Sequence, residues 1–160
     1  MSRRFTRRSY YPRRGPADKY SIEHTTFNTT LNGTTPQSAE VIVDTSDTEG
    51  MRKVKHLTIN ISTSLNGGAS TADVYWALVY VPDGYTANPL NLVAGASLYE
   101  PSQFVLNCGI FEATSGPNRL YSPLSRNLNE GDAIYLILAT TNTSTTVVVS
   151  GVVNYAITLQ

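Results

Sequence analysis

Residues 52–81 read RKVKHLTINISTSLNGGASTADVYWALVYV, and this stretch decides the fold class. In its first half, apolar Leu57, Ile59 and Ile61 alternate with polar residues, which is typical of a strand with one buried face. The Asn-Gly-Gly sequence that follows indicates a turn. Residues 73–81 are apolar on both faces, which predicts a central strand covered by its own core and by a neighbour or partner chain.

The rest of the chain repeats this pattern of short strands. Ser, Thr and Asn supply 47 of the 160 residues, and no helical periodicity extends beyond two turns. Six further segments read as strands: 19–31, 39–43, 103–110, 119–125, 133–140 and 145–159. The sequence therefore predicts an all-β sandwich of eight antiparallel strands in two four-stranded sheets. A jelly roll and an immunoglobulin-like topology are the main options, and the strand count favours the jelly roll.

The pattern also predicts details of packing. Tyr20, Ile22 and Phe27 are expected to point inward, and a bulge or bend is expected near Thr25–Thr26 and again at Gly151. One face of the fifth strand is predicted to hold four residues: Phe104, Leu106, Cys108 and Ile110. The single cysteine cannot form an internal disulfide and is expected to lie in the core.

The formal net charge of zero conceals a strong asymmetry. Residues 1–14 contain six Arg and no acid, whereas residues 15–160 contain six basic and twelve acidic residues, so their sum is 6 − 12 = −6. The change falls near Gly15-Pro16. We therefore divide the chain into an Arg-rich N-terminal arm, 1–18, and a folded body, 19–160. The arm lacks apolar mass and is expected to be disordered. No segment is apolar enough to predict a secretory signal or insertion into a membrane.

The arm has the composition of a nucleic-acid-binding segment. Guanidinium groups bind phosphates, and aromatic rings stack on unpaired bases. We expect strong, salt-sensitive binding without sequence preference, and nuclear import is a compatible second role. A solubilising tail, or binding to acidic membranes or proteins, is the alternative. The candidate residues of the arm are Arg3, Arg4, Phe5, Arg7, Arg8, Tyr10, Tyr11, Arg13 and Arg14.

A second basic group, Arg52, Lys53 and Lys55, opens the third strand. Alternation places Lys53 and Lys55 on one face, where they either extend the nucleic-acid surface or form an ordinary polar strand end.

We expect no enzymatic activity, no cofactor and no bound metal. His24 and His56, the only histidines, lie in no ligand-spaced motif, and no nucleophile or dinucleotide-binding motif is present. The acidic residues at 44, 47 and 49 could hold Ca²⁺, although we favour a solvated loop.

Three segments resemble capsid proteins of circular Rep-encoding single-stranded DNA viruses, the circovirus-like group. They are VYWALVYVPDG at 74–84, SLYEPSQFVLNCG at 97–109 and SPLSRNLNEGDAIYLIL at 122–138. The resemblance covers about residues 53–140. It implies a single jelly roll in which the eight strands, in sequence order, form one sheet with the order 1-8-3-6 and another with the order 2-7-4-5.

The resemblance also implies a viral life cycle. Sixty copies would form a T=1 icosahedral capsid, arms inward, around circular single-stranded DNA. The protein would reside in the virion, would enter the host nucleus through the import machinery, and would meet a host receptor that the sequence does not identify. Small satellite-type RNA viruses share this plan. A cellular trimeric jelly-roll binding module and a β-sandwich glycoside hydrolase are the further alternatives.

Overall fold

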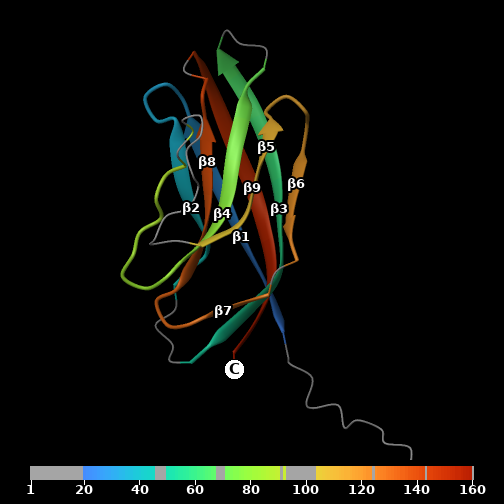
Figure 1. Cartoon of the computed structure of the whole chain (residues 1–160). Coiled ribbons are helices and arrows are strands. Elements are labelled where there is room, and N and C mark those ends of the chain that lie inside the picture. The colour runs from blue at the N-terminus through green and yellow to red at the C-terminus, as the bar shows by residue number, and fades with distance from the viewer. Residues whose placement is uncertain are drawn as a thin grey trace, which may run out of the picture.

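The computed structural model describes residues 20–45, 50–67, 71–90, 92, 104–123, 125–142 and 144–159 (Figure 1). Within these ranges the chain is all-β, and two antiparallel sheets pack face to face. Sheet A has the order β1-β9-β3-β6, with β7 also paired to β3; sheet B has the order β2-β8-β4-β5. The strands are β1 (Ser21–Leu31), β2 (Gln37–Val43), β3 (Arg52–Gly67), β4 (Asp73–Val81), β5 (Phe104–Glu112), β6 (Asn118–Ser122), β7 (Arg126–Leu128), β8 (Ala133–Thr140) and β9 (Thr145–Leu159).

This arrangement confirms the predicted jelly roll. The chain passes between the two sheets, so that the first strand pairs with the last and most pairings join segments far apart in the sequence. Once β6 and β7 are counted as one interrupted strand, both sheet orders agree with those that the resemblance implied. The predicted arm, residues 1–18, lies outside the described residues.

The predicted sixth strand, 119–125, corresponds to β6 and ends earlier, at Ser122, and the sequence did not predict β7, so sheet A contains five strands. β6 pairs with the middle of β3, and β7 pairs with its beginning. Between these two pairings β3 carries a bulge at Lys55–Thr58, where His56 has a φ of 55°. Pro123 follows β6 and has no N–H group to continue the hydrogen-bond ladder.

Neither predicted bulge exists, because the register between β1 and β9 is continuous from Ser21 opposite Ile157 to Leu31 opposite Val147. Gly151 lies opposite Phe27, and a Cβ atom at Gly151 would overlap the Phe27 ring. This glycine therefore marks a close approach of a side chain rather than a break in pairing. The bulge that does occur lies in β3.

The main core lies between the sheets. Leu57, Ile59 and Ile61 are buried there as predicted, and they pack with residues of β4 and β8. A second cluster covers the far face of sheet B, where Leu90 packs on Val79 and Ile137. The central strand β4 is thus buried on both faces as predicted, and the second cover is the connection that follows it in the same chain.

Several predicted core positions are wrong. Ile22 is 79% exposed and lies on the outer side of sheet A, and Tyr20 contacts Lys55 rather than the core. On β5, Cys108 and Ile110 are exposed. The register of β5 against β4 shifts between Leu78 and Val79, which changes the alternation, and the inward place opposite Trp76 is taken by Gly109. The four residues assigned to one face therefore do not share it.

Candidate nucleic-acid interface

The outer face of sheet A, which points away from sheet B, carries polar and basic side chains. In β3, Val54 lies before the bulge and Leu57 lies within it, and both side chains point inward. The side chains of Lys53, Lys55 and Thr58 point outward. The bulge takes up the extra residue between the two halves of the strand. Both halves consequently present their apolar residues to the core.

The neighbouring strands extend this face. Arg119 of β6 pairs with Asn60, and Tyr121 pairs with Thr58. In β7, Asn127 pairs with Lys53. Arg119, Tyr121 and Asn127 are all exposed. Although β6 and β7 are distant from β3 in the sequence, their exposed side chains therefore share one surface with those of β3. We call Lys53, Lys55, Arg119 and Tyr121 the basic strip.

The charges of the described residues separate by face. Of five Lys and Arg residues, three belong to the basic strip. None of the eight described Asp and Glu residues occupies an outward position in the strands of sheet A. The described chain gives Lys53 and Arg119 no acidic partner. Among the described residues, a polyanion would therefore meet positive charge without competing carboxylates on this face.

Lys55 of the basic strip contacts Tyr20, the first residue of the folded body that the structure describes. Its Nζ atom lies 4.5 Å from the centre of the Tyr20 ring, and Tyr20 directly precedes β1. Arg14 is six residues earlier in the chain. The Arg-rich segment precedes Tyr20 in the sequence, and the described body thus begins beside the strip.

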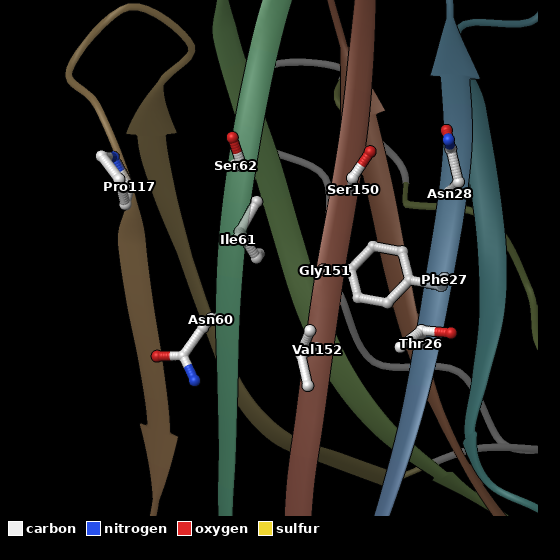
Figure 2. A pocket seen from close by; sticks show the side chains of 10 residues that line it. All are labelled: Thr26, Phe27, Asn28, Asn60, Ile61, Ser62, Pro117, Ser150, Gly151 and Val152. Carbon is white, nitrogen blue, oxygen red and sulfur yellow. The ribbon is translucent and has the colours of Figure 1, made fainter.

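A hollow of about 490 Å³ adjoins the strip on the same side of sheet A (Figure 2). It is bordered by β1, β9 and β3 and by Pro117 from the β5–β6 turn. Figure 2 shows Ser62, Ser150 and Asn28 in one row across β3, β9 and β1, and Asn60, Val152 and Thr26 in the neighbouring row. Asn60 is paired with Arg119, so the rim of the hollow meets the end of the strip. Its amide and hydroxyl groups offer neutral hydrogen bonding.

The remaining two cations are held by the fold. Arg52 is buried, and its guanidinium donates to the carbonyl oxygens of Asp44 at 3.0 Å and Asp132 at 3.1 Å. Arg126 stacks over the Tyr80 ring, 4.2 Å from its centre, and also lies over Phe104. Arg52 therefore does not belong to an exposed basic surface in this structure, and we leave it out of the proposed interface.

A buried carboxylate organises one end of the sandwich. Asp132 accepts hydrogen bonds from the Tyr80 hydroxyl at 2.7 Å and from the backbone N–H groups of Asn129 and Asp83, at 2.8 and 3.1 Å. Burial, followed by the interaction with Asp132, raises the pKa of Tyr80 above its usual value. A Cβ atom at Gly131 would overlap Asp83. Two of the segments that carried the viral resemblance, around Asp83 and around Asp132, thus meet in space.

The structure brings together only part of the predicted site. Lys53 and Lys55 share a face as predicted, whereas the nine arm residues lie outside the described ranges. Sequence reasoning missed Arg119 and Tyr121, which face outward on a short strand whose partner could not be read from local periodicity. Of the proposed Ca²⁺ carboxylates only Asp44 is described, and the described residues contain no group of three or more His, Cys, Asp or Glu able to hold a metal ion.

No protein-family model and no curated protein matches this chain. No helix among the described residues is long and apolar enough to cross a membrane.

Proposed function

We propose that this chain is the coat protein of a small icosahedral virus of the circovirus-like group, which packages single-stranded DNA without sequence preference. One observation carries the proposal. A jelly-roll body with a basic outer face on sheet A joins an Arg-rich segment beside that face, at Tyr20 and Lys55. A polycation next to an otherwise acidic body suits a protein that gathers a polyanion on one side and contacts other copies elsewhere.

The arm supplies most of the binding free energy. With six Arg per chain, sixty copies would bring about 360 guanidinium groups (6 × 60) to the genome. Each neutralised phosphate releases counterions, so binding weakens steeply with salt. Phe5, Tyr10 and Tyr11 add stacking on unpaired bases, which tolerates any sequence. The same basic segment serves host nuclear import before assembly.

Contacts between copies involve the apolar edge of sheet B. Within the described part of the chain β5 pairs only with β4, and Phe104, Val105 and Ile110 are 49%, 37% and 53% exposed. An exposed edge strand with large apolar side chains is normally covered by another chain. Many such contacts, each weak alone, produce a stable closed shell of T=1 symmetry. The finished virion presents its remaining surface to an unidentified host receptor.

The proposal is tested by the mass and content of particles formed by the full chain. We expect particles of about 1 MDa, since sixty copies of 17.4 kDa give 60 × 17.4 = 1,044 kDa. Assembly with an equal mixture of circular single-stranded DNA and RNA of the same length should protect the DNA from nuclease. Preferential protection of RNA would favour a satellite-type RNA virus. A trimer of about 52 kDa (3 × 17.4) that protects neither would favour a cellular binding module.

A further inference from the structure

We propose that the basic strip is a second binding surface for single-stranded nucleic acid, with Lys53, Lys55 and Arg119 contacting phosphates and Tyr121 stacking on a base. If the chain forms a shell, this surface places the outer face of sheet A on the interior side. The second statement rests on the proposed function, whereas the first does not.

The strip has the length and order of groups that a strand requires. Lys53 and Asn60 are seven residues apart along β3, and because the bulge takes up one of these residues, the span is about 20 Å at about 3.3 Å per residue. Lys53 and Lys55 lie at one end, and Arg119 lies beside Asn60 at the other. Tyr121 lies between them in register with Thr58. Cations thus flank an aromatic ring along one direction, as in grooves that bind single strands.

The composition of this face favours nucleic acid over an acidic protein. Tyr121 is 46% exposed in the centre of the strip, which suits a base. Asn127 and the hollow beside Asn60 provide the amide and hydroxyl groups that bind sugar and phosphate oxygens. Because the Arg-rich segment joins the body at Tyr20, a strand held by the arm would already lie close to Lys55.

The two faces of the sandwich differ in a way that defines orientation. The described outer positions of sheet B carry no Lys or Arg, and the residues around Leu90 cover part of that face. Around a polyanion, the face of sheet A gains attraction that the face of sheet B does not offer.

The first experiment measures the salt dependence of binding of the full chain to the oligonucleotide (dT)20. The variant Lys53→Gln/Lys55→Gln should lower the slope of log K against log salt by about 1.4, since each lost contact removes about 0.7. Arg119→Gln should lower it by about 0.7. The matched control Val41→Glu/Thr86→Glu makes the same change of net charge on the side of sheet B, and its slope should equal that of the wild type. Equal slopes for the strip variant and the wild type would overturn the proposal.

The second experiment tests the aromatic group. Tyr121→Ala should weaken binding of (dT)20 about fivefold or more, and Tyr121→Phe should restore it, because stacking needs only the ring. Ultraviolet cross-linking with a bromodeoxyuridine-containing (dT)20 should give an adduct at Tyr121 as well as in the arm. Adducts confined to residues 1–14 would refute the strip. An adduct at Tyr121 in a protein that never assembles would support the strip and refute the capsid.

The orientation is tested by polymer-linked amine labelling of assembled particles. Lys53 and Lys55 should react in dissociated subunits and should be protected in intact particles. Equal rates of reaction in the two states would place the strip on the exterior and would overturn the predicted orientation.

Discussion

Replacing Asp132 by Asn should strongly destabilise the sandwich without changing its shape. The carboxylate accepts three hydrogen bonds, two at Oδ2 from Tyr80 and Asn129 and one at Oδ1 from the N–H group of Asp83. An amide can accept at only one of these two positions, and its NH2 group would face a donor at the other. Bonds to a charged acceptor are worth about 1.5–3 kcal/mol each and neutral ones about 1 kcal/mol. Losing one bond and weakening two gives a cost of about 3 kcal/mol.

Urea unfolding of the full chain, followed through the fluorescence of the single tryptophan, measures this cost. Trp76 packs against the main core and over Gly109, so its emission reports on the body. With a slope of about 2 kcal/mol per molar urea, the midpoint should fall by about 1.5 M. The matched control is Glu130→Gln, which removes the same charge from an exposed position in the same turn and should change stability by less than about 0.5 kcal/mol. Equal midpoints for the two variants would refute the role of Asp132.

Three other predictions concern packing, exposure and pH. Gly151→Ala should cost about 1–3 kcal/mol because its Cβ atom would overlap Phe27; a Phe27→Ala background should remove most of that cost in urea unfolding, and additive effects would contradict the contact. Cys108 should react with a thiol reagent in the native, dissociated protein as fast as in urea; a requirement for unfolding would show that it is buried. Tyr80 has a raised pKa, so the native state keeps a proton that the unfolded chain loses above about pH 10, and stability should fall as pH rises beyond that point; if Tyr80→Phe showed an equally steep fall between pH 9 and 11, this cause would be wrong.

Local periodicity predicted three strands together with their bounds. The bounds of β4, β8 and β9 agree with those expected from the sequence, because continuous or strictly alternating apolar residues define them. Periodicity assigned Cys108 and Ile22 to the wrong face of the sheet, because the face of Cys108 depends on a bulge and Ile22 lies at a strand end. Such features are decided by the partner strand rather than by the segment itself.

The candidate site could be predicted only in part for the same reason. Lys53 and Lys55 share one strand, so their common face follows from alternation alone. Arg119 and Tyr121 join them through a pairing between segments about sixty residues apart, which no single window of the sequence contains. Burial of Arg52 likewise follows from its contact with Asp132, eighty residues away.

Deleting residues 1–14 tests the central claim most directly, because it removes all six arm Arg residues and leaves the sandwich intact. We expect unchanged tryptophan fluorescence, a salt slope lower by about 4 (6 × 0.7), and loss of nearly all nuclease-protected nucleic acid per subunit. A truncated protein that folds and still protects nucleic acid at the wild-type level would contradict the account.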